Sequence, residues 1–596
     1  MKYLAYLNKF FFKYKWHFLL GLLFVSASNY FRVLMPQMIR EAMDLVIDNI
    51  ALYKIFDGSS LQNDLFKHIG NTLLFFGVLV LLLALLMGVF MYFMRQTIIV
   101  MSRLIEYDLR KEIFDHYQVL DLAFFKRNKT GDLMARITED VSKVRMYLGP
   151  AILYGINLST LFVLVIYAMI SVSPTLTLYA LAPLPFLSIS IYYVSNLINI
   201  KSEAIQKRLA GLNSVAQEVY SGIRVVKSYV QEIPMGKYFA KKSVEYKDEA
   251  MGLAKINALF FPLMLLLIGT STILTVYIGG LQVVKGTLTP GNIAEFVIYV
   301  NMLTWPVTAI GWIASIIQQA AASQKRLNEF LNTEPTVQNP GGKLTTLNGD
   351  IRFENVSFTY PDTGIKALEN IDFHLRPGAK LAIIGRTGSG KSTIADLLVR
   401  MYDVSTGQIL IDGQNIQDIN LHQLRRKIGY VPQDMFLFSD TIAENIAFGC
   451  QEAVSRPLIE STAKSASVYD DIMDFPEGFD TPVGERGVTL SGGQKQRISI
   501  ARALIKKPDL LILDDCLSAV DTKTEKEILG YFEKELTNKT AIIITHRIYS
   551  LLDFDKIIVL DNGKMVEQGK HEDLLELKGY YYDLFEQQLK EQERER

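Results

Sequence analysis

Residues 385–392 read Gly-Arg-Thr-Gly-Ser-Gly-Lys-Ser, and this stretch decides the fold of the C-terminal half. It follows the apolar, strand-like run 380–384 and precedes the helix-like segment 393–401. In that context G-x-x-x-x-G-K-S predicts a phosphate-binding loop between a strand and a helix. The glycines let backbone N–H groups close around phosphates, and the helix N-terminus adds the positive end of its dipole.

The loop supplies the predicted nucleotide-binding residues, which are Gly385, Arg386, Thr387, Gly388, Ser389, Gly390, Lys391, Ser392 and Thr393. The pattern assigns Lys391 to the β- and γ-phosphates of ATP and the Ser392 hydroxyl to Mg²⁺. A second apolar run, 510–513, ends in Asp514 and is typical of a buried strand followed by a carboxylate. We expect Asp514 to hold the Mg²⁺ shell. Short strands alternating with helices around both motifs indicate an α/β domain.

A third motif lies between these two and precedes the basic helix 495–506. It consists of Leu490, Ser491, Gly492, Gly493 and Gln494. The three motifs, in this order and spacing, resemble the nucleotide-binding domain of ABC proteins. In that family Ser491 would cap a helix, and the two glycines would let its backbone approach a γ-phosphate. The opposite subunit's loops hold that phosphate, so the resemblance implies a head-to-tail dimer with two ATP molecules.

The same resemblance gives roles to further residues near the predicted strands. Tyr360 matches the aromatic residue that stacks on adenine, and Gln433 matches the residue that touches Mg²⁺ or the attacking water. His546 matches the histidine that contacts the γ-phosphate. Ser518 and Asp521 match the family's D-loop. The loop at 385–392, Gln433 and His546 all follow predicted parallel strands, whose carboxyl ends are where α/β sheets place ligands.

The N-terminal half has the composition of a membrane domain. The 596-residue chain is 49% hydrophobic, and its long apolar runs beside ordinary charged stretches indicate a membrane part joined to a soluble part. Its formal net charge is zero, which does not favour nucleic-acid binding. Its two cysteines imply no disulfide framework. A span needs roughly 20 mostly apolar residues. Six candidates precede residue 320, at about 17–38, 71–94, 148–172, 175–198, 258–284 and 293–317.

Charge predicts the orientation of these spans. The gaps after the second and fourth spans are long and rich in Lys and Arg, whereas the opposite gaps carry few basic residues. The positive-inside rule therefore puts both termini, both long gaps and the nucleotide-binding domain in the cytosol. We expect a multi-pass protein of the cytoplasmic (inner) membrane.

Two polar residues, Asn29 and Arg32, lie deep in the first span. An ionisable residue inside a membrane usually faces a bundle interior or a water-filled cavity, which favours a substrate path. The alternative is that Arg32 extends toward an interface or pairs with another helix.

Six spans ahead of one cassette resemble the exporter type of ABC protein. Residues 124–133 and 218–232 resemble the two cytosolic loops that transmit cassette closure to the spans. The predicted fold is an α-helical membrane domain plus an α/β P-loop ATP-binding cassette. We expect a transmembrane domain over 1–318, a linker over 319–350, a nucleotide-binding domain over 351–588 and a polar tail over 589–596.

Asp515 departs from the family pattern, in which Glu polarises the attacking water. Asp is one methylene shorter, and a misplacement of about 1 Å can slow a reaction about 10²-fold. The alternative is that the backbone shifts and Asp515 works normally. The departure resembles the degenerate-site subunit of bacterial heterodimeric multidrug exporters, which favours a heterodimer and leaves a homodimer open. The leading hypothesis is an ATPase, with Asp515, Gln433 and His546 as catalytic residues, that exports a drug-like or lipid amphiphile. The alternative is a regulatory ATP-binding subunit that hydrolyses little ATP itself.

Overall fold

The computed structural model describes residues 2–339, 347–516, 524, 527–528, 530, 539–546, 548 and 554–595. The chain divides into two compact units. The first comprises 1–117 and 131–333, and the second comprises 118–130 and 334–596. Each unit has its own apolar core.

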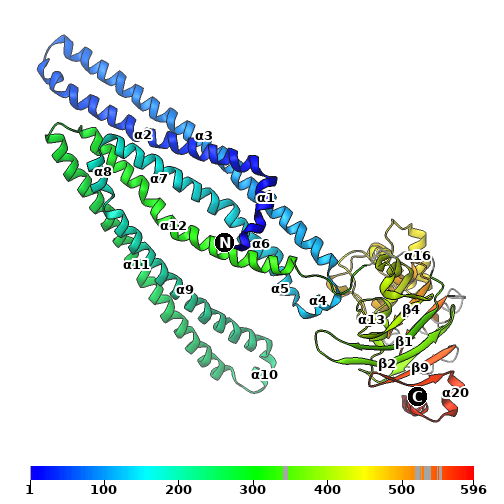
Figure 1. The fold of residues 1–596 in the computed structure, drawn as a ribbon. Coiled ribbons are helices and arrows are strands. Elements are labelled where there is room, and N and C mark those ends of the chain that lie inside the picture. The colour runs from blue at the N-terminus through cyan, green and yellow to red at the C-terminus, as the bar shows by residue number, and fades with distance from the viewer. Residues whose placement is uncertain are drawn as a thin grey trace. The chain divides into compact units, whose positions relative to one another are not determined.

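Long helices build the first unit. Within the described residues, six helical stretches are long and apolar enough to cross a membrane, as the sequence predicted. The long helices are α2 (Lys15–Ile55), α3 (Ser60–Val119), α7 (Ile152–Val172), α9 (Pro183–Ser221), α11 (Glu232–Val284) and α12 (Pro290–Leu331). Figure 1 shows α9 and α11 as a long pair, with α10 (Ile223–Ser228) at its tip.

Shorter helices complete the first unit. They are a 3-10 turn (Lys2–Leu7), α1 (Asn8–Lys13), α5 (Thr130–Ala135), α6 (Val141–Met146) and α8 (Pro174–Leu181), with π-helical turns at Arg136–Asp140 and Tyr147–Ala151. Helix α12 runs through Pro306 without a break. Residues 319–331, expected to begin the linker, belong to α12, because this stretch contains strong helix formers and neither Gly nor Pro.

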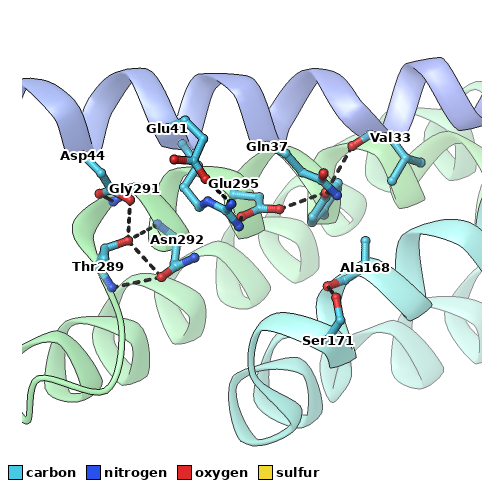
Figure 2. Close-up of polar contacts among 12 residues, drawn as sticks. Val33, Gln37, Glu41, Asp44, Ala168, Ser171, Thr289, Gly291, Asn292 and Glu295 are labelled. Atoms are coloured by element: carbon cyan, nitrogen blue, oxygen red, sulfur yellow. Dashed lines mark hydrogen bonds and ion pairs between the residues drawn. The ribbon is translucent and has the colours of Figure 1, made fainter.

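A polar cluster joins α2 to the start of α12 (Figure 2). The fully buried carboxylate of Glu295 pairs with Arg40 at 3.1 Å and accepts a hydrogen bond from the Tyr299 hydroxyl at 3.0 Å. Asp44 accepts a hydrogen bond from the Gly291 backbone N–H at 2.8 Å. Because a buried charge is costly unless it is paired, these contacts hold the two helices at one relative position.

Two sheets build the second unit. The antiparallel sheet has the order β2-β1-β4-β5, and the mainly parallel sheet has the order β10-β9-β3-β8-β7-β6. The strands are β1 (Ile351–Thr359), β2 (Lys366–Leu375), β3 (Lys380–Gly385), β4 (Thr406–Ile411), β5 (Gln414–Asn415), β6 (Ile428–Val431), β7 (Leu510–Asp514), β8 (Thr540–Ile544), β9 (Lys556–Asp561) and β10 (Lys564–Gly569).

Helices cover these sheets and form a separate helical part. They are α13 (Lys391–Leu398), α14 (Leu421–Lys427), α15 (Ile442–Ala447), α16 (Arg456–Ser465), α17 (Tyr469–Met473), α18 (Gly492–Leu504), α20 (His571–Glu576) and α21 (Tyr580–Glu595). The segment expected as a polar tail from residue 589 continues helix α21 to Glu595. The predicted α/β fold is confirmed.

Helix α4 (Leu122–Arg127) belongs to the second unit although its sequence neighbours belong to the first. Ala123 is fully buried in the apolar core under the antiparallel sheet. Asp121 caps α4 by accepting the Phe124 N–H at 3.1 Å, and its other oxygen accepts hydrogen bonds from Thr336 and Val337. The carboxylate of Asp121 therefore ties α4 to the chain segment that leads into the cassette.

Low pH should weaken the attachment of α4 to the segment that contains Thr336 and Val337, because that attachment depends on the Asp121 carboxylate. Burial alone would raise the pKa of Asp121, but hydrogen bonds from Thr336, Phe124 and Val337 outweigh it and lower the pKa. The stabilisation is thus complete above the ordinary Asp pKa of about 4 and is lost as pH falls through the lowered value. Amide hydrogen exchange should show that residues 122–127 lose protection at low pH. Asp121→Asn should weaken protection at neutral pH and remove its pH dependence; an unchanged profile would contradict the role of the carboxylate.

Candidate nucleotide-hydrolysis site

Strand order brings the predicted loops to one edge of the parallel sheet. The neighbouring strands β3, β8, β7 and β6 run parallel, so their carboxyl ends meet there. These ends carry the 385–392 loop, His546, Asp514 with Asp515, and the segment containing Gln433. The expectation that these segments follow parallel strands is confirmed.

The loop after β3 has a backbone that only glycine accommodates. Gly390 has φ of +98°, and a Cβ there would lie 2.5 Å from the Ala367 carbonyl oxygen. A Cβ on Gly385 would lie 2.1 Å from the Leu560 carbonyl oxygen. The amine of Lys391 donates to the carbonyls of Gly385 and Arg386, at 2.9 and 2.8 Å. Burial lowers the pKa of Lys391, which Asp515 and Asp514 partly counter.

Asp514 and Ser392 suit a magnesium ion. Asp514 ends β7, is buried, and accepts a hydrogen bond from Ser392. Its Oδ1 atom, like the Ser389 hydroxyl, is buried without a hydrogen-bond partner among the described residues. Burial raises the pKa of Asp514. An unsatisfied carboxylate oxygen beside a hydroxyl offers the hard oxygen ligands that Mg²⁺ takes together with water and phosphate oxygens.

Asp515 brings the three predicted catalytic side chains together. Its Oδ1 atom lies 3.0 Å from His546 Nδ1, and its Oδ2 atom accepts a long hydrogen bond of 3.5 Å from Gln433 Nε2. Asp515 has φ of +48°, and its backbone N–H donates to the Ile544 carbonyl at 2.9 Å. Asp tolerates this left-handed conformation better than most residues do. Both carboxylate oxygens thus face partners at the sheet edge.

Tyr360 lies beside the 385–392 loop in a small aromatic group. Its hydroxyl is 3.0 Å from the Thr393 hydroxyl, and its ring packs edge-on against Tyr402 with centroids 5.5 Å apart. The amine of Lys126, from α4, lies 5.0 Å from the centroid of the Tyr360 ring. Sequence reasoning missed Lys126, because the packing of α4 against this group joins segments far apart in the chain.

Ser491 caps helix α18, as the resemblance implied. The Ser491 hydroxyl accepts the Gln494 N–H at 3.2 Å, and the Gln494 side chain accepts the Ser491 N–H at 3.0 Å. Leu490 is buried in the core of the helical part. Gly492 and Gly493 form the first turn, so their N–H groups lie at the positive end of the helix dipole.

Four further predicted residues have other outcomes. Ser518 and Asp521 lie outside the described residues. Asn29 is buried and donates to the Asn157 carbonyl at 3.0 Å and to the Thr160 hydroxyl at 2.6 Å, so it ties α2 to α7. Arg32 is half-buried in α2, with no ion-pair partner in the part of the chain that the structure describes.

A phosphate-binding loop, a carboxylate at the end of a parallel strand of the same sheet and six apolar helices among the described residues define a membrane-bound P-loop ATPase. Two family models match: "ABC transporter transmembrane region" over residues 18–307 and "ABC transporter" over residues 368–518.

Relatives and a solved structure agree with these models. A probable multidrug resistance ABC transporter ATP-binding/permease protein of Bacillus subtilis is 40% identical over 82% of this chain and 83% of its own length. An ATP-dependent lipid A-core flippase of Syntrophus aciditrophicus is 35% identical over 86% of this chain and 85% of its own length. The structure of a bacterial Atm1-family ABC exporter with ATP bound is similar with a TM-score of 0.77 and 27% identity. The matched region covers 96% of this chain and 99% of the exporter's chain.

The chain therefore belongs to the ABC transporter family, as an exporter with a membrane region fused to its cassette. It is a multi-pass membrane protein and a nucleotide-binding transport ATPase, and ATP drives export. The predicted fold and family are confirmed.

A half-buried carboxyl next to this site, that of Asp396, should make cassette stability depend on pH. Burial, reinforced by Asp514 and opposed by Lys126 and Tyr430, raises the pKa of Asp396 to about 6. The folded state therefore binds a proton that the unfolded state has released, and stability falls as pH rises from about 4 to about 6. Asp396→Asn should raise the unfolding temperature at pH 8 by removing a cost on the order of 3 kcal/mol at most.

Thermal unfolding of the nucleotide-free chain at pH 5 and pH 8 measures this effect. The gain should shrink at pH 5, where Asp396 is largely protonated. Asp509→Asn is a matched control, because Asp509 is a more exposed carboxylate paired with Lys427. A variant no more stable than the parent at pH 8 would contradict an energetic cost of the ionised Asp396 carboxylate in the folded state.

Proposed function

We propose that the chain is half of a dimeric exporter that moves an amphipathic substrate, drug-like or lipid, across the cytoplasmic membrane by alternating access. ATP binding closes two cassettes in the cytosol, and hydrolysis with phosphate release resets them, because ATP binds the closed state better. The observation that carries the proposal is the grouping of Asp515, His546 and Gln433 beside the 385–392 loop, in a chain with six apolar helices.

Different residues of this chain bind the phosphates, the metal ion, the attacking water and the adenine of ATP. Backbone N–H groups of the 385–392 loop and the α13 N-terminus bind the phosphates, and Lys391 exchanges its carbonyl partners for phosphate oxygens. Ser392 and Asp514 would hold Mg²⁺, with Gln433 nearby, and the ion would neutralise developing charge on the phosphates. Asp515 orients the attacking water, and His546 meets the γ-phosphate. Tyr360 supplies an aromatic surface for adenine.

The short side chain of Asp515 makes this chain's own site slow. Its two oxygens are drawn toward His546 and Gln433, and it is one methylene shorter than the Glu of the family. A carboxylate set back from the water orients it poorly, and errors of about 1 Å are costly in such a reaction.

A second chain would complete the transporter. The described side-chain contacts of Ser491 and Gln494 are with each other and with Asp471, and the α18 N-terminus is free to face another chain's nucleotide. The intact motif 490–494 would complete a partner's site that carries Glu, which favours a heterodimer. Arg32, half-buried in an apolar helix, is a candidate contact for an anionic part of the substrate.

A second candidate function is a regulatory subunit that binds ATP and hydrolyses little. The engagement of both Asp515 oxygens by neighbouring side chains favours it. In that case the chain's nucleotide would hold the dimer together while the partner's site turns over.

Lengthening the Asp515 side chain tests both candidates. Asp515→Glu should raise the ATPase rate in lipid, measured per dimer that the chain forms with itself, by about 10- to 100-fold, because the carboxylate would reach the water. Asp509→Glu, the same change at the residue before β7, should leave the rate unchanged, and Lys391→Met gives the background. No rise with Asp515→Glu would contradict the idea that this position limits turnover.

The mass of the chain expressed alone tests the partnership. For a heterodimer we expect monomers or unstable dimers with weak ATPase activity, because each composite site needs the partner. Mass photometry in nanodiscs and ATPase assays with candidate amphiphiles measure this. A stable homodimer with brisk, substrate-stimulated ATPase would contradict the heterodimer and the slow site together.

A further inference from the structure

An apolar slot of about 710 Å³ opens between α1, α2, α7 and α12 in the membrane unit. Phe11 and Phe18 line it on one side, and Gly155 and Ile313 line it from α7 and α12. Its volume lies within the range of about 300–1,000 Å³ typical of small-ligand sites. The slot is therefore large enough for part of an amphiphilic molecule.

The helices contribute to the slot from the same end of their predicted membrane spans. The slot takes the first turns of α2, the residues on both sides of the α7 start, and positions 313 and 317, where the predicted span 293–317 ends within α12. Basic segments flank these span ends, so the positive-inside rule places them at the cytosolic leaflet. Trp16, exposed beside the slot, is typical of the headgroup level.

The slot carries one positive charge, that of Lys15, that no acidic side chain pairs with among the described residues. Of the basic residues near the start of α2, Lys9 pairs with Glu112 at 2.6 Å and Lys13 pairs with Asp108 at 2.6 Å. Lys15 lines the slot and has no ion-pair partner in the part of the chain that the structure describes. A cation at headgroup level above an apolar cavity is complementary to an anionic headgroup with an acyl chain.

We propose that this slot binds an anionic phospholipid of the inner leaflet, with its phosphate at Lys15 and an acyl chain along Phe18, Gly155 and Ile313. Placement in the inner leaflet rests on the proposed function, which puts the cassettes, and with them the cytosolic ends of the spans, on the inner side of the membrane. Gly155 has no side chain, and no atom lies within 4 Å of the position that a Cβ would take there. The slot is therefore open at Gly155, and a larger side chain would extend into it. The site is separate from the nucleotide site and requires no hydrolysis.

Native mass spectrometry of the full chain, titrated with phosphatidylglycerol or zwitterionic phosphatidylcholine, tests the proposal. Lys15→Gln should weaken phosphatidylglycerol binding about fivefold, the effect of about one basic residue at an anionic lipid surface, and leave phosphatidylcholine binding unchanged. Gly155→Leu should weaken both lipids by filling the slot. Lys54→Gln, at the far end of α2, and Gly280→Leu, another glycine with open space around it, are matched controls and should bind as the parent does.

The outcomes separate the possible occupants. Equal affinity of the parent for both lipids, or unchanged phosphatidylglycerol binding in Lys15→Gln, would overturn the proposal. A disulfide between a cysteine placed at 155 and a second chain, with no lipid preference, would assign the slot to a partner helix instead and also overturn it. If Gly155→Leu does not fold, Lys15→Gln alone decides. ATPase activity, measured in parallel, tests the proposed function, since lipid binding can persist without hydrolysis.

Discussion

The pairing of β8 with both β3 and β7 is the contact on which the nucleotide site depends. β8 pairs in parallel with β3 through Ile544 and Ile383, and with β7 through Ile544 and Asp514. The same strand end accepts the Asp515 N–H at the Ile544 carbonyl. These strands are buried on both faces, so an altered register would disrupt the core as well as separate the phosphate loop from Asp514 and His546.

The membrane unit is subject to a different constraint, because lipid offers its polar groups no hydrogen-bond partners. Its long helices satisfy their own backbone hydrogen bonds, which lipid requires, and their polar side chains are mostly paired. Glu295 pairs with Arg40 and Tyr299, and Asn29 bridges two helices. Arg32 and Lys15 differ because their charges have no ion-pair partner in the described part of the chain, and each lies beside apolar surface where an external anion is favoured.

Helix α4 shows how one short segment can join a cassette that lies far along the chain. Asp121 binds the segment that leads into β1, Ala123 enters the cassette core, and Lys126 lies over the Tyr360 ring. A shift of the Tyr360 ring would therefore alter its contact with Lys126 of α4. The contact is local electrostatics and packing, and it places a residue of α4 beside the 385–392 loop.

The sequence by itself determined the six apolar spans, the α/β cassette and most of the site. Hydrophobic runs are read directly from composition, and residues 385–392 carry a local backbone requirement that glycine placement reveals. Tertiary structure alone decided that Asp515 contacts His546 and Gln433, that α4 joins the cassette, and that Asp396 is half-buried beside the site. Those features depend on which distant segments pack together, and burial, pairing and pKa arise only once packing has excluded water.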